Sequence, residues 1–374
     1  MVPFAATSWN WQAPLPCQKY GKIHGRSLPV YLLPSTRFFA MRAPQSTRSD
    51  ARWAWRHRFS WLTVCTTVLL ICWGGVVTSI GAGMAFPDWP TSLGSYNLIN
   101  PVDEWWTVPA YLAEHGHRLV ASVVGMLTVA LAAWTWWDDP RAWMRKLGLA
   151  AAVLVVVQGI LGGLRVLWVS IDLATVHACV AQLFFAVLVA MTLFTSETWR
   201  ERRGVLGTGS TSGRLRGLAY AATAGIYLQI VLGALLRHSG GGVSAGFTAF
   251  HVTGAFVVVG LVLAVFVVAE KHYDDVPVVR RAARALFGAM SLQFALGLAA
   301  LLVMLYEEGQ SGLSLAPVLL TVAHLVVGAL LFGTSIVTSL LVARTSLAES
   351  SMQPPRSTAE RAPTKEPALA GADS

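Results

Sequence analysis

The sequence has few charged residues, which make up only 13% of its 374 residues, whereas hydrophobic residues make up 55%. So few charges cannot cover the surface of a soluble protein of this length, and the mean hydropathy of +0.56 agrees. A soluble globular protein is therefore excluded, and membrane lipid is the expected solvent. Lys and Arg outnumber Asp and Glu by 28 to 19. In a membrane protein this excess is typical of cytoplasmic loops, so no nucleic-acid partner is predicted.

Cysteine is also scarce. Cys17 lies in the N-terminal segment, and the other three cysteines lie within apolar runs: Cys65, Cys72 and Cys179. This distribution excludes a disulfide framework and a C-x-x-C metal site. Acidic residues are nearly absent from residues 1–58, where Asp50 is the only one. This segment also lacks the uninterrupted apolar run of a signal peptide, so we predict a basic disordered cytoplasmic tail there. Residues 343–374 are predicted to be a second disordered cytoplasmic tail.

Eight apolar runs are long enough to cross a bilayer, which takes roughly 20 residues of helix. They cover residues 59–82, 112–137, 147–167, 173–196, 217–237, 247–269, 284–306 and 315–342. Alternate connections carry most of the Lys and Arg, so by the positive-inside rule both termini and the connection 197–216 face the cytoplasm. The predicted fold class is an all-α membrane protein with eight transmembrane helices.

The chain repeats itself at a fixed interval. Gly74, Gly81 and Gly83 recur 159 residues later as Gly233, Gly240 and Gly242. A Q-x-x-x-G segment also occurs three times, at residues 158–162, 229–233 and 293–297. Recurrence of small residues at helix interfaces is the alternative explanation, but a constant offset favours duplication. We therefore predict two pseudo-symmetric four-helix bundles, residues 59–196 and 217–342, joined by the cytoplasmic linker 197–216.

Four of the nine histidines lie within the apolar runs, one in every second run: His117, His177, His251 and His324. Each lies near the start of a run that leads from the outside inwards, so all four are expected at a similar depth. A lone membrane histidine is usually explained by a hydrogen bond to a neighbouring helix. Four at equivalent positions of a duplicated bundle favour axial ligation of haem iron by facing imidazoles. Two bundles then predict two haem sites.

Other polar residues lie near the same outer plane. Glu114 precedes His117 by three residues and shares its helical face; the E-x-x-H spacing also occurs in di-iron sites, but these need further Glu residues that this chain does not offer. Arg118, Arg165 and Arg237 are predicted to pair with haem propionates, although snorkelling to the interface explains them as well. The tryptophans of the first outer loop, from about residue 85 to 111, indicate either an interfacial belt or a lid.

Together these motifs resemble the haem A synthase family across residues 59–342. They are GGVVTSIGAGMAFPDWP followed by EHGHR, QGILGGLRV with His177 downstream, QIVLGALLRHSGGG with His251 downstream, and His324. The resemblance implies an oxidoreductase that oxidises the ring methyl group of haem O to a formyl group, giving haem A for cytochrome oxidase assembly. Many bacterial members carry a cysteine pair in the first outer loop, and this chain has no cysteine there.

The resemblance also assigns roles and partners. His251 and His324 would hold a haem b cofactor, and His117 and His177 would hold the substrate haem O, with Glu114 required for turnover. The implied partners are haem O synthase, cytochrome oxidase assembly factors, an electron donor and further copies of the chain. The implied location is the inner (plasma) membrane of a bacterium, with the mitochondrial inner membrane as alternative. A di-haem b electron-transfer subunit without its own catalysis remains the rival, since only Glu114 argues against it.

Overall fold

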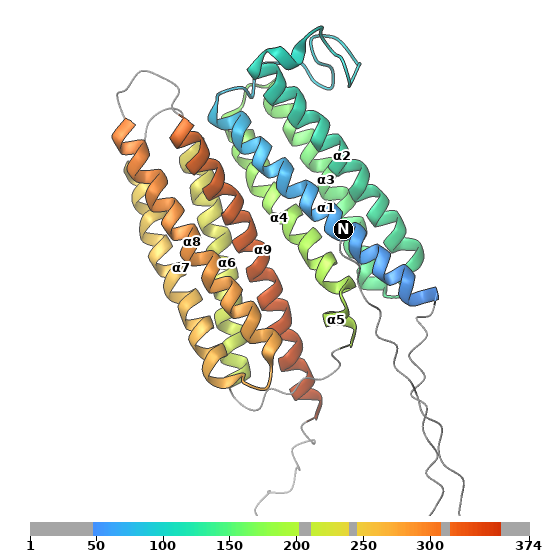
Figure 1. Cartoon of the computed structure of the whole chain (residues 1–374), viewed down its shortest axis with the longest axis vertical. Coiled ribbons are helices and arrows are strands. Elements are labelled where there is room, and N and C mark those ends of the chain that lie inside the picture. The colour runs from blue at the N-terminus through green and yellow to red at the C-terminus, as the bar shows by residue number, and fades with distance from the viewer. Residues whose placement is uncertain (1–47, 202–210, 239–244, 308–314, 353–374) are drawn as a thin grey trace, which may run out of the picture. The chain divides into compact units, whose positions relative to one another are not determined.

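The computed structural model describes residues 48–201, 211–238, 245–307 and 315–352, all within one compact unit of residues 46–374. The described residues form helices joined by turns and by the longer segment 80–108, with no strand beyond an isolated bridge between Ser92 and Ser95. The helices are α1 (Arg48–Ser79), η1 (Trp105–Thr107), α2 (Pro109–Asp138), α3 (Ala142–Leu167), α4 (Ile171–Thr195), α5 (Glu197–Glu201), α6 (Thr211–Arg237), α7 (Ala245–His272), α8 (Pro277–Glu307) and α9 (Leu315–Met352) (Figure 1).

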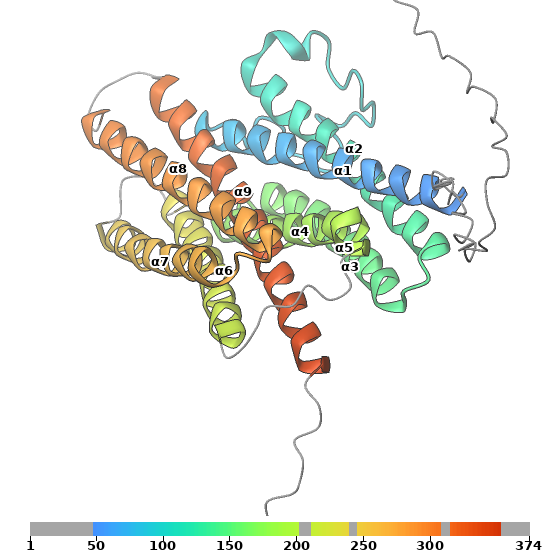
Figure 2. The same ribbon diagram turned by 60° about the horizontal axis from the view of Figure 1, so that its bottom comes forward.

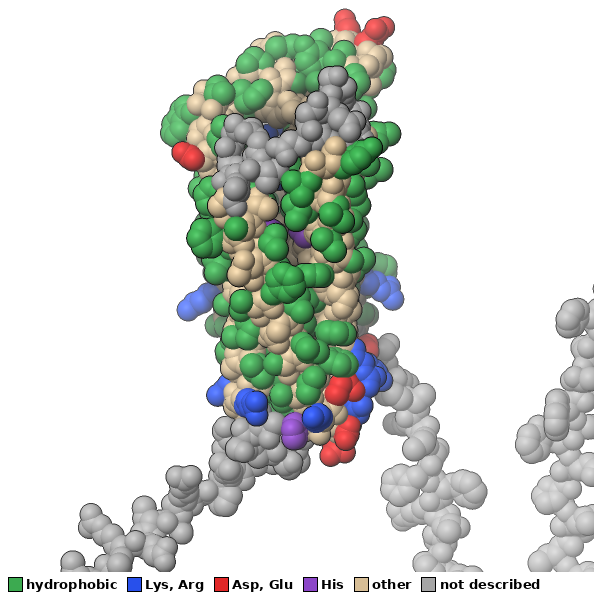
Figure 3. Space-filling model, turned by 90° about the vertical axis from the view of Figure 1, so that its left-hand side faces the viewer, with side chains coloured by type: hydrophobic (Ala, Val, Ile, Leu, Met, Phe, Trp, Pro, Cys, Tyr) green, Lys and Arg blue, Asp and Glu red, His purple; other side chains and the backbone are tan. Residues whose placement is uncertain are grey.

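Eight of the helices in the described ranges, α1 to α4 and α6 to α9, are long and apolar enough to cross a membrane. A helix satisfies its backbone polar groups internally, which is required where no water is present. Large apolar side chains such as Trp136, Val153, Leu228 and Leu302 are exposed on these helices. Figure 3 shows apolar side chains along one face and most of its Lys and Arg gathered at one end. The predicted class, an all-α membrane protein with eight spans, is confirmed.

The membrane helices form two groups of four (Figures 1 and 2). In the first half, α1 contacts α2, α2 contacts α3, α3 contacts α4, and α4 returns to α1. In the second half, α6 to α9 contact one another in the same order, and α9 returns to α6. The halves meet where α9 packs against α1 and α4, and where α4 packs against α6. The predicted pseudo-symmetry and domain division stay predictions.

Each half has its own buried apolar cluster. Val124, Met144 and Phe185 belong to the cluster of the first half, and Val262 and Leu286 belong to that of the second. Small and hydroxyl-bearing residues such as Thr128 and Thr338 are also fully buried between helices, and each hydroxyl bonds to the carbonyl one turn earlier. Close packing through small residues is how helices associate where lipid provides no hydrophobic driving force between them.

The helices extend beyond the predicted runs at three places. Residues 48–58 are the first turns of α1, and residues 343–352 are the last turns of α9, so neither segment is disordered as predicted. The predicted linker 197–216 contains α5 and the start of α6. The remaining parts of the predicted tails and linker, residues 1–47, 202–210 and 353–374, lie outside the described residues.

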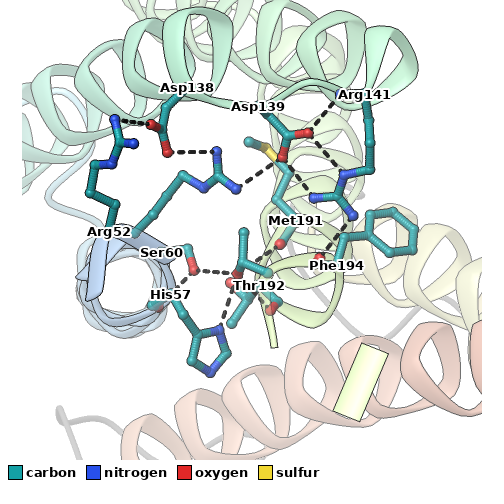
Figure 4. Close-up of polar contacts among 11 residues, drawn as sticks. Arg52, His57, Ser60, Asp138, Asp139, Arg141, Met191, Thr192 and Phe194 are labelled. Atoms are coloured by element: carbon teal, nitrogen blue, oxygen red, sulfur yellow. Dashed lines mark hydrogen bonds and ion pairs between the residues drawn. The ribbon is translucent and has the colours of Figure 1, made fainter. Parts of the chain in front are cut away.

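An ion-pair network explains why α1 continues past the apolar run (Figure 4). The Arg56 side chain is fully buried and its Nη2 lies 3.0 Å from Asp139 Oδ2, while Arg52 Nη1 lies 3.3 Å from Asp138 Oδ1. Arg141 Nη2 lies 2.7 Å from the same Asp139 oxygen. Burial alone would raise the pKa of Asp139, but hydrogen bonds from Arg141 and the charges of Arg141 and Arg56 outweigh it and lower that pKa. Charges that hydropathy assigns to a tail are thus paired between α1 and the C-terminal end of α2.

Candidate functional site

All four predicted histidines lie against a glycine of the preceding membrane helix. A methyl group built on the glycine would lie 3.0 Å from Cε1 of the imidazole at Gly74 and His117, 3.3 Å at Gly162 and His177, 3.2 Å at Gly233 and His251, and 2.8 Å at Gly297 and His324. The distance is below the limit of real carbon contacts at Gly297, at that limit at Gly74, and tighter than most such contacts at Gly162 and Gly233. A larger residue at any of the four positions would therefore require the imidazole to shift. The glycines of the repeated motifs therefore have a common purpose, which is to seat an imidazole.

The two histidines of the second half face each other. The ring centroids of His251 and His324 are 6.3 Å apart, with an angle of 78° between the ring planes. A metal bound about 2.0 Å from each nitrogen, with roughly 1.1 Å from nitrogen to ring centroid for bonds of about 1.33 Å, needs centroids about 6.2 Å apart. The observed separation therefore fits one iron held between both imidazoles.

The imidazole Nδ1 atoms do not make the hydrogen bond that usually explains a membrane histidine. Among the described residues, Nδ1 of all four histidines is buried and has no hydrogen-bond partner, whereas Nε2 of His324 lies 3.1 Å from Gln293 Nε2 on α8. Nor do the described ranges contain a group of three or more His, Cys, Asp or Glu side chains that could hold a metal ion unaided. Paired histidines without further ligands suit a porphyrin iron, since the macrocycle supplies the other four nitrogens. The donor set therefore fits the haem that the resemblance implies.

In the first half, His117 lies against Gly74 of α1 and His177 against Gly162 of α3. Gln158, which begins the repeated segment in α3, donates from Nε2 to the backbone oxygen of His177 at 3.1 Å. Arg165 follows Gly162 by three residues in α3, and a methyl group on Gly83 would lie 3.1 Å from its Nη2. Within the described part of the chain Arg165 makes no hydrogen bond or ion pair, so its guanidinium is available for an anionic group.

Glu114, predicted to be a carboxylate beside the first site, has both oxygens engaged. Oε1 lies 2.7 Å from Arg118 Nη2, and Oε2 accepts from the backbone N–H of Phe86 at 2.9 Å. The residue is 2% exposed. The sequence spacing places Glu114 near His117 but gives no sign of its partner Phe86 on the loop that precedes α2. In this structure Glu114 joins α2 to the segment 80–108.

The three arginines predicted to bind propionates differ in their contacts. Arg118 uses both Nη atoms on that same segment, donating to the backbone oxygens of Phe86, Asp88 and Thr91. Arg237 Nη2 donates to the first half, to Gly75 O at 2.9 Å and Ser79 Oγ at 2.6 Å. Arg165 is left as the arginine with the fewest competing contacts. The propionate role of each arginine stays a prediction.

Residues 80–108 form a folded cap, which we call the outer loop. The Asp88 carboxylate accepts from the N–H groups of Leu93 and Gly94. Burial alone would raise the pKa of Asp88, but these bonds and one from Thr91 lower it. The Trp89 ring lies on α3, where a methyl group on Gly163 would be 2.3 Å from Trp89 Cδ2. Since Gly163 follows the glycine that seats His177, the outer loop lies beside the first site.

His115 binds the outer loop, a role that the sequence did not predict. Its Nε2 lies 2.8 Å from Leu98 O, its Nδ1 lies 3.2 Å from Ser92 Oγ, and its ring packs edge-on against Trp105 at 4.8 Å between centroids. The loop tryptophans were the one available signal, because aromatic residues beside a polar helix end often cover it.

Comparison with known proteins gives matches over about half of the chain. The model of the COX15-CtaA family, described as cytochrome oxidase assembly protein, matches residues 57–249, which include His117 and His177 and end before His251. Relatives named Heme A synthase include those of Exiguobacterium sp. strain AT1b, 30% identical over 187 residues, and Geobacillus kaustophilus, 27% identical over 184 residues. These matches cover 49% and 48% of this chain, and 58% and 56% of the two relatives. The chain thus matches somewhat over half the length of these relatives. Because the family model matches more than half of the chain, this protein belongs to the family of cytochrome oxidase assembly proteins.

Proposed function

We propose that this protein is a membrane oxidoreductase that converts haem O to haem A by oxidising a ring methyl group to a formyl group. The observation that carries the proposal is the seating of four histidines on four glycines, with His251 and His324 at the separation that one iron requires. The relatives named Heme A synthase support the same reaction. A carrier of two haems would share the histidines, so the reaction itself needs a direct test.

In the proposal, His251 and His324 hold a resident haem b, while His117 and His177 hold the substrate. When bound, the haems supply the redox chemistry that side chains cannot. The protein's part is to orient the macrocycle and to exclude water. Arg165 pairs with a propionate near His117 and His177, because its guanidinium makes no other ion pair among the described residues. The outer loop covers the first site through Trp89 and is held by Glu114 and Arg118.

The proposed setting is the plasma membrane of a bacterium, since the relatives compared above are bacterial. The basic ends of the helices, which carry Arg52, Arg56 and Arg141, would face the cytoplasm. The outer loop would then face the outside, where its tryptophans meet the interface. An electron donor, the enzyme that makes haem O and the factors that receive haem A remain the proposed partners.

The test is haem extraction and chromatography from cells that make haem O and carry this protein as their only enzyme for the next step. We expect haem A with the parental chain and none with His117→Leu. Protein that binds two haems of type b while haem O accumulates unchanged would favour the electron carrier. Glu114→Gln should retain haem but accumulate haem O or a hydroxylated intermediate. Glu104→Gln, which changes an exposed acid of the outer loop, should make haem A at the parental level.

A further inference from the structure

One of the contacts between the first and second halves lies at the end of α1, residues 74–79. Gly74 seats His117 of the first site. Its neighbour Gly75 faces the opposite way, because a methyl group there would lie 2.9 Å from Leu325 Cδ2 and 3.3 Å from Val322 Cγ2, both on α9. Leu325 directly follows His324 of the second site. Two adjacent glycines therefore place one turn of α1 against a ligand of the first site and against the helix that carries a ligand of the second.

Arg237, the last residue of α6, fixes this turn from the second half. Its Nη2 donates to Gly75 O at 2.9 Å and to Ser79 Oγ at 2.6 Å. The same Ser79 hydroxyl lies 3.4 Å from Thr321 Oγ1 of α9, three residues before His324. A hydrogen bond from a charged donor is roughly twice as strong as a neutral one. Arg237 thus ties α6 to α1 at the level of both histidine pairs.

We propose that Arg237 is a positioning residue for the first site, contributed by the second half. It holds the part of α1 that His117 packs against, so the second half affects the affinity of the first site for haem. The inference rests on the proposed function only in taking a haem as the ligand of the first site. Both acceptors of the Arg237 Nη2 belong to α1, and the propionate role of Arg237 stays a prediction.

Packing gives the coupling its mechanism. A close-packed interface transmits small displacements because it has little free volume. If the hydrogen bonds from Arg237 to Gly75 and Ser79 are lost, α1 can shift against α9. Gly74, which His117 packs against, then shifts as well. Coupling between two sites is typically worth a factor of 5 to 150 in affinity. The loss of a single charged hydrogen-bonding group should change the affinity by a factor at the low end of that range.

The experiment measures haem binding to the purified apo protein by spectroscopic titration with haem b. His177→Leu and His251→Leu variants first assign the two spectral contributions. We expect Arg237→Gln to weaken the first site by roughly 5- to 10-fold, and Ser79→Ala to weaken it in the same direction by a smaller factor. Arg237→Lys should restore part of the affinity, because an ammonium can still reach one acceptor. Arg214→Gln, the same change at an exposed position of α6, is the matched control.

A second measurement needs no haem. Hydrogen exchange of the amides of residues 76–82, at the end of α1 and the start of the outer loop, should quicken in Arg237→Gln and Ser79→Ala and stay unchanged in Arg214→Gln. The proposal is overturned if Ser79→Ala leaves both exchange and first-site affinity at the parental level, or if Arg237→Gln weakens the second site alone. Failure of the proposed function would look different: haem A would not form, or neither site would bind haem, while the exchange result still stood.

Discussion

The pair formed by Glu114 and Arg118 gives the sharpest prediction, because the sequence resemblance implies a catalytic role for Glu114, whereas in the structure Glu114 holds the outer loop to α2. In Glu114→Gln, the side-chain amide oxygen can still accept from the Phe86 N–H, but the ion pair with Arg118 at 2.7 Å is lost. Removing one partner of a buried pair typically costs 3–5 kcal/mol. Arg118 retains three backbone acceptors and is 17% exposed at its side chain. We therefore expect a smaller cost of about 1.5–3 kcal/mol, that of one hydrogen bond to a charged group.

That cost should appear as opening of the outer loop. At about 1.4 kcal/mol per factor of ten, the open population should rise roughly 10- to 100-fold. Hydrogen exchange of the Phe86, Leu93 and Gly94 amides reports it, since all three are bonded to Glu114 or Asp88. Arg118→Gln should give a larger increase, because it loses the ion pair and also the bonds to the backbone oxygens of Phe86, Asp88 and Thr91.

The double variant decides between the two duties of Glu114. If the pair holds the outer loop closed, Glu114→Gln combined with Arg118→Gln should open the loop little more than Arg118→Gln alone. Glu104→Gln should exchange like the parent. The reasoning is refuted if Glu114→Gln abolishes haem A formation while loop exchange stays at the parental rate. In that case the carboxylate acts on the substrate directly, as the sequence comparison implied.

Three further predictions concern the histidines, the topology and the ion network. Replacing His251 or His324 with Leu should each abolish one low-spin haem b spectrum while the protein still inserts; an unchanged haem b content in both would contradict the pairing. Reporter fusions after Arg200 and after Asp103 should give opposite compartment signals, and equal signals would contradict the eight-span topology. Asp139→Asn should lower the unfolding temperature, because it leaves the buried Arg56 with a weaker partner. Because folding lowers the pKa of Asp139, this carboxylate contributes to stability above its ordinary pKa near 3.8, and the contribution is lost as the pH falls through the lowered pKa. The unfolding temperature in detergent, measured as the pH is lowered, should therefore fall over this range in the parental chain. Asp139→Asn should not show this part of the fall.

The sequence by itself determined the membrane class, the number of spans and the four histidines. Hydropathy suffices for the spans because a helix is the one way a single segment can satisfy its backbone in lipid. The histidines stood out because a polar ring is costly there and recurred at a fixed place in alternate spans. The repeated glycines were visible as a pattern, but only the structure showed that each one seats an imidazole, because that contact lies between helices.

Only tertiary structure decided the partners of the charged residues. Arg56 and Arg52 were assigned to a disordered tail because hydropathy counts charges without seeing Asp138 and Asp139 across the helix interface. Glu114, Arg118 and Arg237 were all placed near the haem sites by their position along the chain. Their acceptors lie on the outer loop and on α1, up to 162 residues away in sequence. A charged side chain in a membrane protein takes whichever partner the packing brings within reach, and local spacing carries no record of that choice.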